Sequence, residues 1–125
     1  MTIGINIDGV LRNLLNKLSL THKKYFESDV SVKKIKDYDL EKYFTFENDG
    51  DNLDKFLYED CSLEIFGYAD EIEEHIVTKL NQFIHKHKED FEVKLLSREC
   101  GRAIPGTLFF LSKTSCLCRN IKFVL

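Results

Sequence analysis

The alternation of apolar and polar positions in residues 1–26 predicts a strand, a tight turn and a helix. Residues 3–7 form a short run dominated by isoleucine, and Gly9 follows almost at once, so we expect a buried strand that enters a turn. Apolar residues then recur at intervals of three and four from Val10 to Phe26, which places one apolar face along a helix. The N-terminus is therefore expected to form a strand–turn–helix unit.

The C-terminal half repeats this alternation. The spacing predicts a helix over 70–88, with acidic residues at its start and basic residues at its end, and then a strand over 91–96. A further helix over 105–115 begins with a proline, which suits the first helical turn, and a last strand covers 121–125. Because strands separated by helices pair in parallel through right-handed crossovers, we expect an α/β fold: a small doubly wound, Rossmann-like parallel sheet with helices on both faces.

Residues 29–69 have a less regular pattern, in which acidic, basic and aromatic residues are mixed. A short helix is expected around Leu53 to Leu57, after the Asp-Gly-Asp turn at 49–51. The aromatic residues of this segment either line a ligand cleft or pack onto the core, and packing is the more common role of such residues. We expect a single domain over 1–125 with a cap-like helical insertion at about 29–69, after the first helix.

Composition and charge narrow the class of partner. The chain has 18 Lys and Arg against 21 Asp and Glu, a formal net charge of -3, so there is no overall basic field to attract a nucleic acid polymer or an acidic membrane surface. No apolar run approaches the roughly 20 residues of a membrane span, and the N-terminus does not resemble a signal peptide. We expect a cytoplasmic protein, in the host cytoplasm if the chain is viral, without nucleic acid or membrane partners.

The cysteines are expected to be free thiols, since no secretory signal points to an oxidising compartment. Two of them form a C-x-C pair, but no paired C-x-x-C and no nearby histidine completes a zinc site. Small residues packed near a helix end therefore explain that pair better than a metal does. The four positions are Cys61, Cys100, Cys116 and Cys118.

Phosphate-binding groups follow the first two predicted strands. In open parallel sheets, ligands bind beyond the carboxyl ends of the strands, where residues 6–13 and 97–102 are expected to meet. The first segment offers Asp8, the turn at Gly9, whose neighbouring amides can point at an anion, and a helix N-terminus. The second segment offers the Ser97 hydroxyl and a basic side chain next to it. Together these groups predict a site for a small phosphorylated ligand.

Residues 5–13, Ile-Asn-Ile-Asp-Gly-Val-Leu-Arg-Asn, resemble the first motif of haloacid dehalogenase-like (HAD) phosphatases. The similarity is to the 5'(3')-deoxyribonucleotidase type of bacteria and phages, whose pattern is D-x-D-G-V-L. Residues 95–97 resemble the second motif, a strand that ends in Ser or Thr, and Lys113 lies on the following helix where the family has its third-motif lysine. The resemblance covers most of the chain and implies a HAD-type fold.

The resemblance also implies roles for individual residues. In the family, a first aspartate attacks the substrate phosphorus and a second, two residues later, protonates the leaving group; here these positions are Asn6 and Asp8. Magnesium would be held by the same two positions together with acidic residues of a fourth motif, which leaves a weak site in this chain. The remaining roles are phosphate binding by Gly9, Val10, Ser97, Arg98 and Lys113, and substrate contact by Arg12.

The chain departs from the family pattern in two places. Asn6 carries a neutral amide, which is neither a phosphoryl nucleophile nor a charged ligand for a hard cation. The sequence also ends at Leu125, before an acidic fourth motif. We therefore expect a degenerate nucleotidase-like protein that retains a phosphate cradle without phosphohydrolase activity and acts as a phosphometabolite-binding or interaction module. The alternatives are an active magnesium-dependent phosphohydrolase on deoxynucleotides or other small phosphomonoesters, and a partner-binding domain with an empty cradle.

The last predicted strand, over 121–125, has no element after it to cover its edge. An apolar strand edge invites pairing with another chain. We expect either a homodimer formed through this C-terminal edge strand or a chain that is a shortened version of a longer relative.

Overall fold

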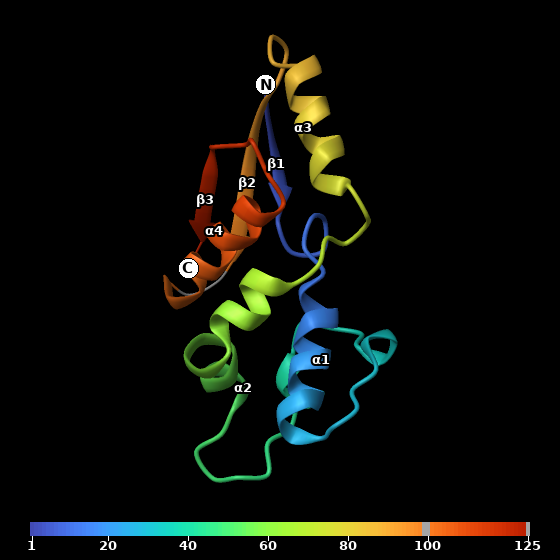
Figure 1. Cartoon of the computed structure of the whole chain (residues 1–125), viewed down its shortest axis with the longest axis vertical. Helices are drawn as coiled ribbons and strands as arrows, with labels where there is room; N and C mark the ends of the chain where they lie inside the picture. The colour runs from blue at the N-terminus through green and yellow to red at the C-terminus, as the bar shows by residue number, and fades with distance from the viewer. Residues whose placement is uncertain (99–100, 125) are drawn as a thin grey trace.

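The computed structural model describes residues 1–98 and 101–124. Strands and helices occur in the predicted order, and the coarse expectation of an α/β fold with a parallel sheet is confirmed (Figure 1). The long elements differ from the predicted ranges mainly at their ends. They are β1 (Thr2–Asn6), α1 (Leu14–Phe26), α3 (Ile76–Lys86), β2 (Glu92–Arg98), α4 (Ile104–Lys113) and β3 (Ile121–Val124). Leu125, the predicted end of the last strand, lies outside the described residues.

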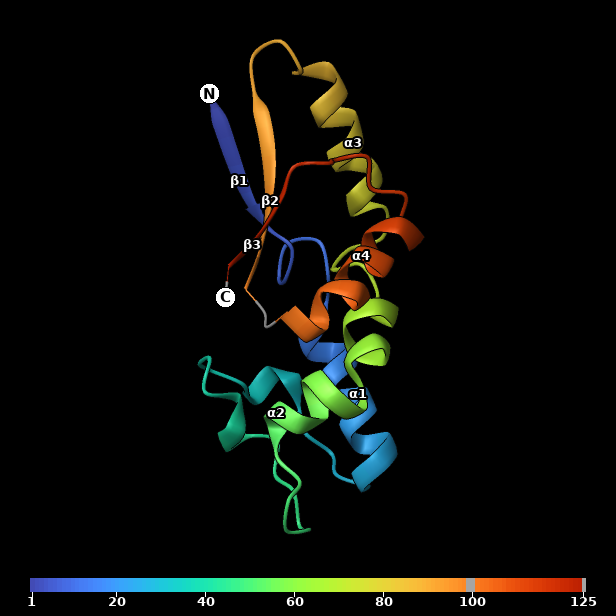
Figure 2. The same cartoon turned by 90° about the vertical axis from the view of Figure 1, so that its left-hand side faces the viewer.

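The sheet is parallel throughout, with the strand order β1-β2-β3. Consecutive strands joined by crossovers of one hand place both connecting helices on the same side, and α3 and α4 do lie on one face of the sheet (Figure 2). On β2, Val93, Leu95 and Ser97 are buried and the residues between them are more exposed. The expectation of a doubly wound sheet with both faces covered is therefore wrong, because that arrangement needs a strand order that reverses direction.

Helix α1 begins at Leu14 and not at Val10, because the residues after β1 form a tight turn first. The backbone N–H groups of Leu11 and Arg12 both donate to the carbonyl of Ile7 at 2.9 Å. Asn13 then caps the helix, since its side-chain oxygen accepts from the amide of Asn16 at 3.3 Å. The apolar residue at position 11 thus belongs to the turn and packs beneath it.

Helix α3 begins at Ile76, although the sequence predicts a start at Asp70. The intervening residues bind the β1–α1 turn instead of forming a helix. The Asn13 amide donates to the carbonyl of Asp70 at 2.9 Å, and the Ile72 amide donates to the carbonyl of Leu11 at 2.8 Å. These long-range hydrogen bonds satisfy backbone groups that a helix would otherwise use.

The segment between α1 and α3 is more helical than its pattern indicates. A helical turn at Leu53–Lys55 (α2) confirms the expected short helix and continues through π-type turns at Phe56–Asp60 and Leu63–Gly67. Before it, the chain runs through two short 3₁₀ turns at Val32–Lys34 and Leu40–Lys42. In Figure 1, this segment and α1 form the end of the molecule away from the sheet.

The apolar residues form two clusters. The sheet cluster fills the space between the strands, α3 and α4, and consists of Ile7, Leu11, Leu80, Val93, Leu95, Phe110 and Leu111. The helical cluster lies between α1 and the segment that follows it, and consists of Leu18, Phe44, Leu53, Phe56, Leu57, Cys61, Ile65, Phe66 and Ala103. Most aromatic residues of 29–69 thus pack onto a core, which was the more common of the two expected roles.

Three of the four cysteines lie in the described part of the chain, and all three are free thiols, as expected: Cys61, Cys116 and Cys118. Burial raises the pKa of the Cys116 thiol above its usual value, so it is a weak nucleophile at neutral pH. Within the described ranges, no helix has the length and apolar character needed to cross a membrane.

Candidate functional site

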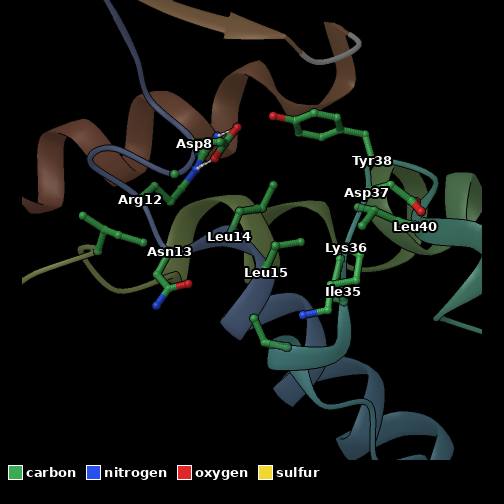
Figure 3. A pocket seen from close by; sticks show the side chains of 13 residues that line it. Asp8, Arg12, Asn13, Leu14, Leu15, Ile35, Lys36, Asp37, Tyr38 and Leu40 are labelled. Atoms are coloured by element: carbon green, nitrogen blue, oxygen red, sulfur yellow. Dashed lines mark hydrogen bonds and ion pairs between the residues drawn. The ribbon is translucent and has the colours of Figure 1, made fainter.

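A cavity of about 590 Å³ opens at the carboxyl end of β1, between the β1–α1 turn and the 3₁₀ turns that follow α1. Gly9 lines it from the β1–α1 turn, and so do Asp8 and Asn13, which Figure 3 shows. Its volume is within the range typical of small-molecule sites. The remaining lining residues are Arg12, Leu14, Leu15, Val32, Ile35, Lys36, Asp37, Tyr38, Leu40 and Ile72.

Asp8 and Arg12 form a two-point ion pair at this cavity. Arg12 Nε donates to Asp8 Oδ1 at 2.6 Å, and Nη2 donates to Oδ2 at 3.0 Å (Figure 3). The two residues are four positions apart in the sequence. The positive φ of 84° at Gly9 allows the chain to reverse direction between them. Planar, two-point pairing of this kind fixes the orientation of the carboxylate.

The Arg12 side chain is fully buried and continues away from the cavity into the protein. Its Nη1 donates to the carbonyl of Phe66 at 2.9 Å and to Thr107 Oγ1 at 2.8 Å. The guanidinium also lies over the rings of Phe66 and Phe110, at 5.1 and 5.5 Å from their centroids. Arg12, expected as a substrate contact, thus joins the β1–α1 turn to the segment before α3 and to α4.

Asn6 and Ser97 lie on opposite faces of the sheet, so the structure does not bring these two predicted site residues together. Asn6 pairs with Leu96 in the register of β1 and β2, and successive residues of a strand point to opposite faces. Asn6 is exposed on the face without helices, whereas Ser97 is 2% exposed on the covered face. Ser97 Oγ has no hydrogen-bond partner within the described residues.

The other predicted phosphate ligands also lie outside the cavity lining, with the exception of Gly9. Lys113 Nζ donates to the carbonyl of Ala69 at 2.9 Å and lies over the Tyr68 ring at 5.7 Å. Partial burial lowers the pKa of the Lys113 ammonium. Arg98 is exposed at the end of β2, and Val10 is 44% exposed on the turn.

No family model matches the chain, and no curated protein or solved structure matches it significantly. The interpretation of the cavity therefore depends on its own residues.

Lys36 is a cavity residue that the sequence did not single out, and Tyr38 was foreseen only as one of several aromatic residues that could line a ligand cleft. Both line the cavity from the segment between the two 3₁₀ turns, and the Tyr38 side chain is fully exposed at its edge. In Figure 3, the Tyr38 hydroxyl is directed toward Asp8 and Arg12. The only signal for them was the mixed aromatic and charged composition of 29–69, which does not reveal which side chains face the turn after β1.

The charges around the cavity leave one lysine uncompensated. Asp8 is paired with Arg12, and Asp37 Oδ2 accepts from Lys42 Nζ at 3.0 Å. The hydrogen bond from Lys42 lowers the pKa of Asp37, so this carboxyl is ionised at neutral pH. Lys36 is exposed, and among the described residues no ion pair involves its ammonium group. The lining of the cavity therefore carries a positive charge at Lys36.

A magnesium site of the expected kind does not fit these residues. Both oxygens of Asp8 already accept hydrogen bonds from a guanidinium, and Asn6 is on the uncovered face of the sheet. Among residues 1–98 and 101–124, no group of three or more His, Cys, Asp or Glu is placed to hold a metal ion. In this arrangement the guanidinium occupies the position at which the carboxylate would meet a cation.

Proposed function

We propose that this protein binds a small phosphorylated ligand in the cavity after β1 and does not hydrolyse it. The observation that carries the proposal is the two-point pair between Asp8 and the fully buried Arg12. The remaining carboxylate of the HAD-like motif anchors the guanidinium and thereby the turn. It does not face a substrate as a free acid–base group.

Anion binding is supported by Lys36 and by the start of α1. The amides of Leu14 and Leu15, at the first two positions of the helix, donate to no acceptor among the described residues. The first turn of α1 contains no acidic residue that would compete with an anion. An anion between these amides and the Lys36 ammonium would gain both hydrogen bonds and a charge interaction.

The absence of turnover follows from position 6. An amide cannot form the phosphorylated intermediate, and general acid assistance alone contributes only about 10²- to 10⁴-fold to a rate. We therefore expect background phosphate release from nucleoside monophosphates with magnesium present. Asn6→Asp should remain inactive too, because the new carboxylate would lie on the uncovered face of the sheet and Asp8 would still be tied to Arg12.

The binding proposal is tested by measuring the melting temperature during a titration with inorganic phosphate. A ligand at ten times its Kd stabilises the native state by about 1.4 kcal/mol, which raises the melting temperature of a domain of this size by about 4 °C. Lys36→Ala should remove most of this shift. Lys34→Ala is the matched control, since it removes the same charge from a residue that does not line the cavity.

Two results would overturn the proposal. One is an unchanged melting temperature in tens of millimolar phosphate. The other is clear wild-type turnover of a phosphomonoester that Asp8→Asn abolishes, which would establish the magnesium-dependent phosphohydrolase in its place.

A further inference from the structure

The cavity has a polar side and an extended apolar wall. The polar lining residues are Asp8, Arg12 and Asn13 at the β1–α1 turn, and Lys36 and Asp37 between the two 3₁₀ turns. The apolar wall is formed by three separate parts of the chain: the first turn of α1, the 3₁₀ segment after it and the residues before α3. Its side chains are Leu14, Leu15, Val32, Ile35, Leu40 and Ile72.

This wall offers few hydrogen-bond partners for a polyhydroxylated ligand. A hydroxyl group that loses water without gaining a protein partner weakens binding, and a sugar has several such groups. An apolar ligand body gains affinity on the same wall, since each methylene group removed from water strengthens binding by about fourfold. The wall therefore selects against a sugar and in favour of a hydrocarbon or aromatic group.

Tyr38 supplies a further apolar surface at the edge of the cavity. Its side chain is fully exposed, and Figure 3 shows the ring standing opposite the turn that carries Asp8 and Arg12. Exposed aromatic rings of this kind are well suited to packing against a planar ligand. A ligand body on the wall would lie between this ring and α1.

Resting on the proposed phosphate site, we propose that the natural ligand is a phosphomonoester with an apolar aryl or alkyl body and no sugar. Its phosphate contacts Lys36 and the amides at the start of α1. Its body packs against the apolar wall and under Tyr38. The phosphate supplies the charge interaction, and the apolar body supplies most of the selectivity.

The test compares dissociation constants measured by calorimetry for four probes: inorganic phosphate, phenyl phosphate, ribose 5-phosphate and phenol. We expect phenyl phosphate to bind at least about tenfold more tightly than inorganic phosphate, because several ring carbons leave water. Ribose 5-phosphate should bind no more tightly than inorganic phosphate.

Substitutions of the cavity residues distinguish the contribution of the ligand's apolar body to affinity from that of its phosphate. Tyr38→Ala should reduce the affinity for phenyl phosphate but not for inorganic phosphate, whereas Tyr38→Phe keeps the ring and should leave both unchanged. Val32→Thr places a hydroxyl in the wall at nearly the same size and should also weaken the binding of phenyl phosphate alone. Lys36→Ala should weaken the binding of inorganic phosphate and of phenyl phosphate alike.

The outcomes distinguish this inference from the proposed function. Suppose that inorganic phosphate binds, but phenyl phosphate binds no more tightly or ribose 5-phosphate binds better. The proposal of an apolar ligand body is then wrong, whereas the proposed phosphate site is unaffected. If phenol binds as well as phenyl phosphate while inorganic phosphate does not bind, the phosphate site is wrong, and the ligand class proposed here falls with it.

Discussion

The sheet cluster and the helical cluster differ in how they are built. The sheet cluster consists almost entirely of aliphatic side chains from elements whose periodicity is visible in the sequence. The helical cluster contains Phe44 and Phe56, which together with the adjoining rings of Phe26 and Phe46 surround the buried His22, at 5.1 to 5.9 Å between ring centroids. The first core follows from local patterns, whereas the second depends on contacts between distant residues.

The proposed ligand cavity lies where the two regions meet, and Arg12 connects them there. The Arg12 side chain contacts Phe66 of the helical cluster and Phe110 of the sheet cluster. One buried cation thus fixes the turn that forms one side of the cavity relative to both cores. Substitutions at Arg12 and within each cluster test this connection.

Arg12→Met should destabilise both regions at once. The substitution removes the donor that Asp8, the Phe66 carbonyl and Thr107 now share. Because the Asp8 side chain is 29% exposed, the cost comes mainly from the two buried acceptors, at about 1 to 3 kcal/mol each. Urea denaturation measures the loss. Arg102→Met is the control, because Arg102 is half-exposed and surface pairs contribute at most about 1 kcal/mol. Equal losses from the two variants would contradict the role given to Arg12.

Phe56→Leu should weaken the helical cluster selectively. The Phe56 ring packs against those of His22, Phe26 and Phe46, and ring pairs contribute about 0.5 to 1.5 kcal/mol each beyond their buried area. We expect a loss of about 2 kcal/mol. Hydrogen exchange should show faster exchange in α1 and α2, with β1 and β2 still protected; uniform acceleration would mean that the two clusters unfold as one unit.

Gly106→Ala tests the close packing of α4 against the π-type turns. A Cβ at position 106 would lie 3.0 Å from Phe66 Cβ and 3.2 Å from the Ser62 carbonyl oxygen, and forced repacking of this kind costs about 1 to 3 kcal/mol. Gly101→Ala is the matched control, since a Cβ there meets nothing within 4 Å. A melting temperature for Gly106→Ala as high as that of the control would show that this contact is adjustable.

Glu64→Gln should have the smallest effect, and that effect should depend on pH. Burial by itself raises the pKa of Glu64, but hydrogen bonds from Lys24 and Tyr25 outweigh it and lower the pKa overall. A lowered carboxyl pKa stabilises the fold above the unfolded-state pKa, and this contribution is lost as the pH falls through the folded-state pKa. The variant should lose less than about 1 kcal/mol at pH 7 and nothing near pH 2. A difference that persists at low pH would point to packing.

The elements with local sequence signals could be predicted from the chain alone. The isoleucine run before Gly9, the apolar face of α1 and the proline near the start of α4 depend on residues a few positions apart, and the structure has strands and helices where these patterns predict them. The expectation of free thiols also holds for Cys61, Cys116 and Cys118. Periodicity and turn chemistry are short-range properties, so they can be read along the chain.

The geometry of the site depends on contacts between residues far apart in the chain. The sequence motif predicted that Arg12 contacts a substrate. Its guanidinium instead donates to a carbonyl 54 residues away and to a hydroxyl 95 residues away. Helix α3 begins later than predicted for the same reason, since residues 70–72 bind the β1–α1 turn. The sheet has one covered face because strand order, which no local pattern encodes, sets the side of each crossover. Lys36 and Tyr38 line the cavity only because the segment after α1 lies next to this turn in the folded structure.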